Sequence, residues 1–164
     1  MWVYTYYAIT IKGGDSERDM ILILYVDDLL LLGEDLSKIE YVKCQLGKLY
    51  QMKDLIHASS YLGIQITRDQ NTQAIWIDQQ VYIENALKRF ELLDANSTNT
   101  PLPAGINLKK SKEPVALNTK TYYQQIIGIL IYAAIGTRPD IAFAEMRLSW
   151  FNNNPMKEHI KYVR

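Results

Sequence analysis

Two adjacent carboxylates, Asp27 and Asp28, interrupt an otherwise apolar stretch of the chain. Only hydrophobic residues occupy positions 20–26 before them and positions 29–32 after them. Two apolar runs around a two-residue polar break predict a β-hairpin with strands buried on both faces and a turn made of the carboxylates. Hard carboxylate oxygens hold Mg²⁺, and a metal held in this way serves phosphoryl or nucleotidyl transfer. The alternative is a solvated turn, in which Asp is a common residue.

Two further elements are expected to flank this hairpin. Residues 2–12 are rich in β-branched and aromatic side chains and run into turn formers at positions 13–16, which predicts a strand followed by a loop. Asp35 or Ser37 can cap a helix that ends near Tyr50. The apolar face of that helix consists of residues spaced by three or four, namely Leu36, Ile39, Val42, Leu46 and Leu49.

The rest of the chain predicts a second hairpin and then helices. Residues 61–67 and 74–77 alternate in polarity around a polar loop, which is typical of paired strands. Asp78 can cap a helix that continues to about Leu93, and the proline- and lysine-containing stretch 96–118 is expected to be a loop. Apolar helical segments follow at residues 121–135 and 140–151. This order of elements predicts an α+β fold with a short antiparallel sheet and helices packed against it.

Composition excludes several classes of protein. With 164 residues, 48% of them hydrophobic, the chain is long and apolar enough for one globular domain, or for one domain and part of another. Its 18 Lys and Arg balance 18 Asp and Glu, which argues against a nucleic-acid binder that relies on bulk charge. The single Cys44, the lack of a signal-peptide pattern and apolar runs too short to span a membrane predict an intracellular protein, in cytoplasm or nucleus, without a membrane partner.

The segment Tyr25-Val26-Asp27-Asp28 resembles the palm motif of reverse transcriptases, most closely those of copia-type LTR retrotransposons. Further segments resemble counterparts in this family in the same order along the chain. They are residues 52–55 and 61–66 (the primer-grip segment), 79–84 and 87–90 (the start of the thumb), 100–103, 123–132, 136–142 and 154–159. Because an ordered series over residues 20–160 is far more specific than one four-letter motif, it favours the family over a plain solvated turn.

The resemblance implies a partial polymerase palm followed by a helical thumb and connection region. The palm would comprise residues 1–78, the thumb would start at 79–95, a linker would span 96–120, and a helical thumb or connection segment would occupy 121–164. The implied activity is that of an RNA-directed DNA polymerase, which extends a primer on an RNA or DNA template with deoxynucleotides and Mg²⁺, or Mn²⁺ in its place. The implied partners are the template-primer, the deoxynucleotides, and the integrase and ribonuclease H of the same polyprotein.

The family's pattern also implies roles at individual positions. Asp27 would be a metal ligand, with Asp28 its neighbour at the site. Tyr25 and Val26 would pack beside the primer terminus, and the alternative is that they are plain core residues. The residues expected to present backbone to the primer's 3′ end are Tyr61, Leu62, Gly63 and Ile64. Glycine permits close approach there, although an ordinary hairpin with a glycine bulge explains this segment equally well.

Basic residues of the thumb region are expected either to meet nucleic-acid phosphates or simply to be solvated. They are Lys88, Arg89, Lys109, Lys110 and Lys112. Near the start of the helix that follows Pro139, Arg138 and Asp140 are expected to form an architectural pair rather than a catalytic one.

One catalytic carboxylate of the family has no counterpart in the sequence. It lies well upstream of the hairpin, and we expect the chain to begin after it and after the fingers region, and to end before ribonuclease H. Asp19 and Asp35 cannot replace it, because about 3.3 Å per strand residue puts them roughly 26 and 23 Å from the turn. The isolated chain is therefore expected neither to polymerise nor to bind Mg²⁺ tightly. The alternatives are a non-enzymatic remnant that binds nucleic acid or proteins of the element, and a decayed reading frame without function.

Overall fold

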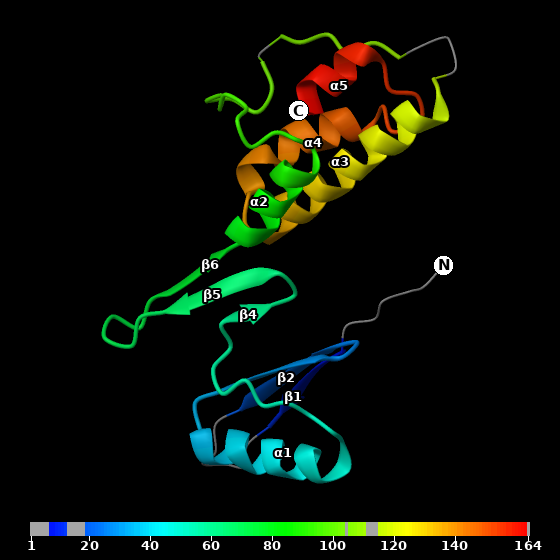
Figure 1. Cartoon of the computed structure of the whole chain (residues 1–164). Helices are drawn as coiled ribbons and strands as arrows, with labels where there is room; N and C mark the ends of the chain where they lie inside the picture. Colours follow the sequence, from blue (N-terminus) through cyan, green and yellow to red (C-terminus); the bar gives the residue numbers. More distant parts are fainter. Residues whose placement is uncertain (1–6, 13–18, 104, 111–114, 164) are drawn as a thin grey trace. The chain divides into compact units, whose positions relative to one another are not determined.

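A computed structural model describes residues 7–12, 19–103, 105–110 and 115–163. It confirms an α+β protein with two small antiparallel sheets and helices. The chain divides into two compact units, residues 1–62 and residues 63–164 (Figure 1).

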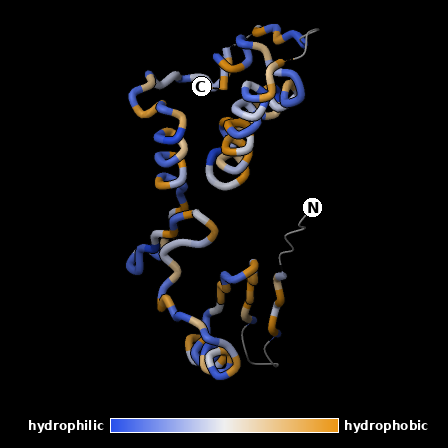
Figure 2. The backbone as a smooth tube through the Cα atoms, turned by 45° about the vertical axis from the view of Figure 1, so that its right-hand side comes forward, coloured by the Kyte–Doolittle hydropathy of each residue, from blue (hydrophilic) through white to orange (hydrophobic). Residues whose placement is uncertain are grey.

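The first unit is built on a three-stranded sheet. Its strands are β1 (Tyr7–Ile11), β2 (Met20–Tyr25) and β3 (Asp28–Gly33), antiparallel and in that spatial order. The composition of these strands suits a pleated surface, and Figure 2 shows their residues mostly in hydrophobic colours. The hairpin turn connects the central strand β2 to β3.

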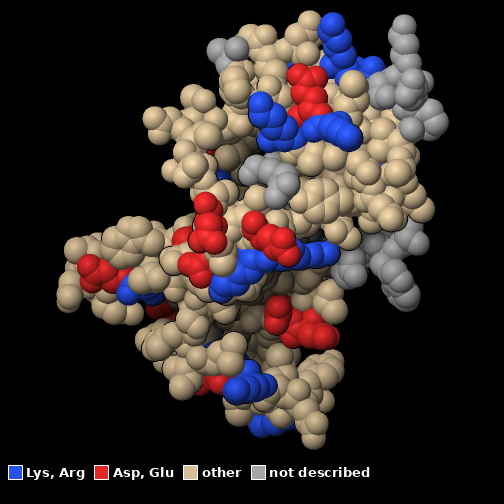
Figure 3. Space-filling view, turned by 45° about the horizontal axis from the view of Figure 1, so that its top comes forward, with Lys and Arg blue, Asp and Glu red and all other residues tan. Residues whose placement is uncertain are grey.

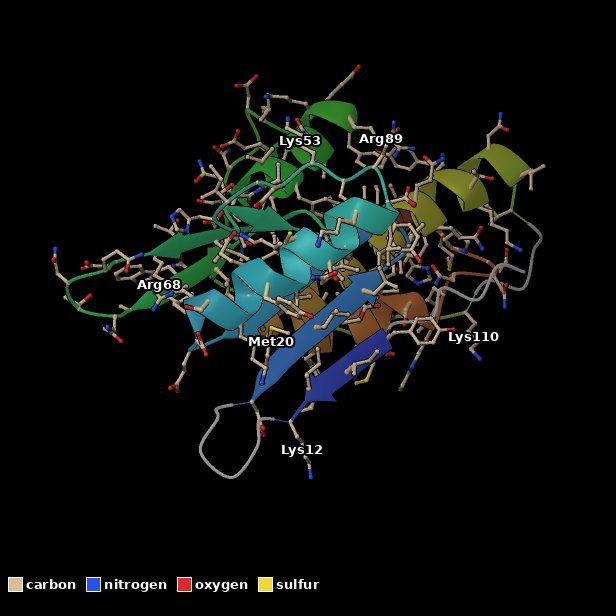
Figure 4. The ribbon with its side chains drawn as sticks, turned by 90° about the horizontal axis from the view of Figure 1, so that it is seen from below. Lys12, Met20, Lys53, Arg68, Arg89 and Lys110 are labelled. Atoms are coloured by element: carbon tan, nitrogen blue, oxygen red, sulfur yellow. The ribbon has the colours of Figure 1, made fainter. Side chains whose placement is uncertain are left out.

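Helix α1 (Leu36–Leu49) covers one face of this sheet (Figures 1 and 4). It begins where the sequence predicts, because the Asp35 carboxylate accepts hydrogen bonds from the backbone N–H groups of Ser37 at 2.9 Å and Lys38 at 3.2 Å. Met20, at the start of β2, is only 1% exposed. A Cβ added at Gly33 would touch both Met20 and Ile39, so the helix lies close against the start of β2 and the end of β3.

The strands of the hairpin are less buried than their composition predicts. Met20 is the one buried residue among the described residues of β2 and β3, whereas Ile21 is 40% and Leu32 is 44% exposed. Successive strand residues point to opposite faces, so Met20 faces α1 and Ile21 does not. The expectation of a hairpin buried on both faces is therefore wrong for this structure, because α1 packs against one face alone.

The second unit begins with a hairpin and continues with helices. Strands β5 (Ile64–Arg68) and β6 (Ile75–Asp78) pair antiparallel, with Gln65 opposite Asp78 at the open end. The helices are α2 (Gln80–Arg89), α3 (Leu117–Gly136), the 3-10 helix η1 (Pro139–Ile141), α4 (Ala142–Ser149) and α5 (Lys157–Val163). The other helices pack around the longer α3 (Figure 1).

The core of the second unit lies between α3 and its neighbours. Tyr123, Ile127 and Leu148 are almost fully buried, and Phe90 and Val163 join them from the ends of α2 and α5. The Tyr123 hydroxyl donates a hydrogen bond of 2.8 Å to the carbonyl of Leu148, which satisfies the buried polar group. Burial also raises the pKa of Tyr123 well above its ordinary value, so this phenol stays protonated.

Two predicted helix boundaries differ from the structure. α2 ends at Arg89 rather than near Leu93, because Glu91 adopts a φ of 56° and the N–H of Leu92 donates to the carbonyl of Leu87 at 2.8 Å. α3 begins at Leu117, inside the stretch predicted to be a loop.

The predicted strand at 61–67 is also two elements rather than one. Leu62 and Gly63 have φ values of 51° and 79°, and this turn separates the two-residue strand β4 (Ser60–Tyr61) from β5. Of the predicted strand at 2–12, residues 7–11 form β1, whereas residues 2–6 and the loop at 13–16 lie outside the described residues.

Candidate functional site

The hairpin turn consists of Val26 and Asp27, one residue earlier than the sequence predicts. Tyr25 and Asp28 pair with each other as the last residue of β2 and the first of β3, so Asp28 belongs to a strand. Val26 has a φ of 51°, whereas Asp27 is not among the residues with positive φ. A two-residue turn with positive φ at its first position alone is the pattern of a type II′ turn, which suits the twist of a hairpin.

The backbone of Val26 is strained. A β-branched residue rarely adopts positive φ, because its side chain crowds the backbone, and such a conformation costs about 1–3 kcal/mol. The Val26 side chain is 60% exposed, so burial does not explain why valine occupies this position. Because backbone strain of this kind clusters at functional sites, the turn is a functional candidate on geometric grounds.

Asp28 lies on the sheet face that α1 leaves uncovered. The register places it with Tyr25 and Ile23 on one face, whereas Met20 faces α1 from the other. The carboxylates of Asp27 and Asp28 are both exposed, and neither takes part in a hydrogen bond or ion pair with another described residue. Both carboxylates are therefore available to a ligand at the tip of the hairpin.

The two carboxylates suit Mg²⁺ in kind but not in number. Their hard oxygens are the ligands this ion prefers, and it commonly binds through one or two carboxylates with water and phosphates completing the octahedron. Within the described residues, no three His, Cys, Asp or Glu side chains form a group that could hold a metal ion. Asp19 and Asp35 flank the other end of the hairpin, where Met20 pairs with Gly33. Any third protein ligand would therefore come from outside this part of the chain.

The segment expected to face a primer forms a tight turn. Tyr61 ends β4, Leu62 and Gly63 form the turn with positive φ at both positions, and Ile64 begins β5. Two consecutive residues with positive φ are typical of a type I′ turn, which explains the glycine without any ligand. The turn nevertheless exposes Gly63, where a backbone can approach closely.

The basic residues expected to meet phosphates are exposed but dispersed. Lys88 and Arg89 lie in the last turn of α2, and the Arg89 guanidinium lies 5.6 Å from the centre of the Phe90 ring. Lys109 and Lys110 are exposed in the stretch before α3, well away from Arg89 as Figure 4 shows for Lys110. Lys112 lies outside the described residues. On the face drawn in Figure 3, acidic and basic side chains are interspersed, so no single basic patch forms there.

The predicted pair of Arg138 and Asp140 is confirmed. The Arg138 Nε and Nη2 atoms donate to the two Asp140 oxygens at 2.9 and 2.8 Å, a bidentate arrangement at the start of η1. The hydrogen bonds that Arg138 donates to the Asp140 carboxylate lower the pKa of Asp140 and raise the pKa of Arg138.

The sequence predicts no individual role for Gln79. Its side chain is only 1% exposed and bonds to α3, although a polar residue at a helix start is ordinarily expected on the surface. Nothing in the local pattern of residues distinguishes it from the exposed Gln80 beside it. Burial of this kind depends on contacts between elements far apart in sequence.

Comparison with known proteins gives the family. The model of the family described as reverse transcriptase (RNA-dependent DNA polymerase) matches residues 4–104. The chain therefore belongs to the reverse transcriptase family, and its relatives place it with the copia-type retrotransposons.

These relatives are encoded by transposons of plants and yeast. The retrovirus-related Pol polyprotein from transposon TNT 1-94 of Nicotiana tabacum is 39% identical over 96% of this chain, which covers 12% of that protein. A transposon Ty5-1 protein of Saccharomyces cerevisiae is 34% identical over 91% of this chain, which covers 48% of it. The Pol polyprotein from transposon RE1 of Arabidopsis thaliana is 31% identical over 87% of this chain, which covers 10% of it. The chain thus spans less than half the length of these relatives.

Two searches gave a negative result, one against solved structures and one for membrane-spanning helices. No solved structure is significantly similar to the chain. None of the helices in the described ranges combines the length and the apolar character needed to cross a membrane.

Proposed function

We propose that this chain supplies two metal-binding carboxylates to the active site of an RNA-directed DNA polymerase. The observation that carries the proposal is a pair of exposed carboxylates, Asp27 and Asp28, at the strained Val26 turn, which bond to no other side chain or backbone group that the structure describes. The turn lies within residues 4–104, which match the reverse transcriptase family model. Function is therefore assigned to a geometric feature inside the matched region and does not rest on the match alone.

Each residue of the tip has a separate role in the proposed reaction. Asp27 and Asp28 hold the catalytic ion, Mg²⁺ or Mn²⁺, and β3 fixes Asp28 through its pairing with Tyr25. When bound, the metal stabilises the attacking and leaving oxygens of the nucleotidyl transfer. Tyr25 and Val26 form the surface beside the primer terminus, and Tyr61, Leu62, Gly63 and Ile64 present backbone to the primer's 3′ end. Residues 1–78 would form part of the palm. Residues 79–95 would start the thumb, and residues 121–164 would form a helical thumb or connection segment.

The remaining parts of the site would come from the rest of a Pol polyprotein. Two carboxylates from one turn make a weak metal site, and the described residues offer no third. We therefore expect an upstream segment to contribute the missing aspartate and the grip on template and deoxynucleotide. Integrase and ribonuclease H would be neighbours in the same polyprotein, and support for a polyprotein comes from relatives that are named Pol polyproteins.

Primer extension on an RNA template with Mg²⁺ tests this proposal. Two proteins are compared: the 164-residue chain, and the same chain fused to the upstream reverse transcriptase segment of the TNT 1-94 polyprotein. The fusion is expected to extend the primer, and Asp27→Asn or Asp28→Asn to reduce the rate at least about a hundredfold, because metal-held charge is worth several kcal/mol in the transition state. Asp94→Asn is the matched control, since Asp94 is an exposed carboxylate remote in sequence from the turn.

Three outcomes decide between the alternatives. A split active site is supported if the fusion extends the primer, the 164-residue chain does not, and Asp27→Asn abolishes the extension. Extension by the 164-residue chain contradicts the missing-ligand account. A folded fusion that never extends a primer contradicts the proposed function. The alternative of a nucleic-acid-binding remnant has no separate support from the basic residues, which are dispersed.

A further inference from the structure

The hydroxyl of Tyr132 lies against the turn glycine Gly63. A Cβ added at Gly63 would be 3.4 Å from the Tyr132 oxygen, so the phenol lies next to this glycine on the side where a side chain would project. Tyr132 belongs to α3, whereas Gly63 immediately precedes β5. The helix therefore contacts the β5–β6 hairpin where the hairpin begins.

Tyr132 is in contact with α2 and with Gln79, the residue before α2. Its ring packs edge-on against Tyr82 of α2, with ring centres 4.7 Å apart and planes at 63°. Its backbone carbonyl accepts a hydrogen bond of 3.4 Å from the Gln79 amide nitrogen. Gln79 thus joins the end of β6 to the same helical turn that contacts Gly63.

Gln79 fits its buried position closely. Its amide oxygen accepts a hydrogen bond of 2.9 Å from the Thr137 hydroxyl, so both ends of the amide are satisfied by α3 and the residue after it. A Cβ added at Gly136 would overlap the end of the Gln79 side chain. The backbone carbonyl of Gln79 also accepts the first hydrogen bond of α2, from Ile83 at 2.9 Å. Side chain and backbone together fix where β6 becomes α2.

Both attachments lie at the same end of the hairpin. Gln65 pairs with Asp78 at the open end, so Gly63 before β5 and Gln79 after β6 are close to that end, away from the exposed loop around Asp69. Fixing both strands at one end restricts how the hairpin can tilt relative to α3.

We propose that Tyr132 and Gln79 are positioning residues that set the place of Gly63, and through it the place of the primer's 3′ end. This inference rests on the proposed function, in which the Gly63 turn faces the primer. Neither side chain needs to touch the substrate, because each acts through the backbone that it holds.

The polymerase fusion provides the test of positioning. Tyr132→Phe removes the oxygen beside Gly63 and keeps the ring on Tyr82, whereas Gln79→Ala removes the hydrogen bonds to Tyr132 and Thr137. In pre-steady-state primer extension, each variant is expected to slow the burst rate about tenfold, because a displaced reactant loses rate steeply with distance. Tyr122→Phe, a tyrosine of the same helix whose ring packs on Phe90, is the matched control and should leave the rate unchanged.

The burst separates positioning from folding. A merely structural role would reduce the burst amplitude, which counts active molecules, and leave the burst rate as it was. Unchanged burst rates in both variants would overturn the proposal while the Asp27-dependent activity of the parent fusion still stood.

A second measurement needs no polymerase activity. Amide hydrogen exchange of Gly63 and Ile64 in the 164-residue chain should become about tenfold faster in Tyr132→Phe and in Gln79→Ala, and not in Tyr122→Phe. Exchange that stays the same at the turn, or that accelerates equally along all of α3, would contradict the proposed positioning even if the fusion never extended a primer.

Discussion

His159 is a histidine held neutral by its surroundings. It is fully buried in α5, its Nδ1 atom accepts a hydrogen bond of 2.9 Å from the N–H of Met156, and its ring stacks on Phe151 at 4.0 Å. Burial lowers the pKa of His159, and the Glu158 charge and the backbone of Lys109 oppose this only in part. A proton on Nδ1 would also abolish its role as acceptor, so both effects favour the neutral ring.

The protein should lose stability as the pH falls below about 6.5, the ordinary pKa of histidine. Because the folded-state pKa lies below that of the unfolded chain, the unfolded state binds the proton first. The contribution of His159 is therefore complete above that pH and is progressively lost as the pH falls further. Urea unfolding at pH 7, 6 and 5 should show this fall, and His159→Gln should remove it, whatever its effect at pH 7.

The other histidine supplies the control. His57 is exposed, so His57→Gln should retain the full dependence on pH. A slope that survives in His159→Gln and disappears in His57→Gln would contradict the assignment.

Individual residues were predictable where their role is local. Asp35 follows from capping chemistry, because the residues next to it determine the cap. The roles of Asp27 and Asp28 come from a motif and stay predictions. Gln79 and His159 were not predictable, since their burial depends on α3 in one case and Phe151 in the other. The strain at Val26 was equally hidden, because a one-residue shift of the turn created it.

Elements were predicted best where the termination signal lies in the chain itself. The boundaries of α1 agree with the capping pattern. The end of α2 and the break at Gly63 depend on positive φ at Glu91 and Leu62. Neither glutamate nor leucine is a residue type that predicts positive φ. The burial of the strands was overestimated because an apolar run reports what a strand can bury, and α1 packs against only one face.

The joint between α2 and α3 allows a prediction against helix propensity. Gly136 closes α3, and alanine is ordinarily the better helix former. Here the added methyl would displace Gln79, so Gly136→Ala should lower the free energy of unfolding by about 1–3 kcal/mol, as overpacking does. Urea denaturation of the 164-residue chain measures the change.

Gly128 is the matched control, since it lies in the same helix with nothing within 4 Å of an added Cβ. Gly128→Ala should raise the free energy of unfolding by about 0.5–1 kcal/mol. In a Gln79→Ala background, Gly136→Ala should cease to destabilise, because the overlapping side chain is gone. Equal losses with and without Gln79 would show that the overlap is not the cause.

At the scale of the whole molecule, charge limits what the chain can bind alone. Its 18 basic and 18 acidic residues cancel, and the exposed Arg89 lies apart from Lys110 (Figure 4). A protein that neutralises few phosphates releases few counterions, so its affinity for nucleic acid is weak and depends little on salt. Tight binding of a primer-template would then require the rest of a polyprotein.

Titration of a fluorescent primer-template duplex with the 164-residue chain at several salt concentrations tests this. The logarithm of the binding constant should fall with the logarithm of salt concentration at a slope of no more than about −2 to −3, since each phosphate contact contributes about −0.9. Replacing Lys88 and Arg89 together by Ala should flatten the slope by about 2, whereas Lys53→Ala, an exposed lysine in the first unit, should leave it unchanged. A slope steeper than about −5, or one that ignores Lys88 and Arg89, would mean that another surface carries the contact. In that case the proposal that tight duplex binding requires the rest of a polyprotein would be wrong, because the chain would hold the duplex by itself.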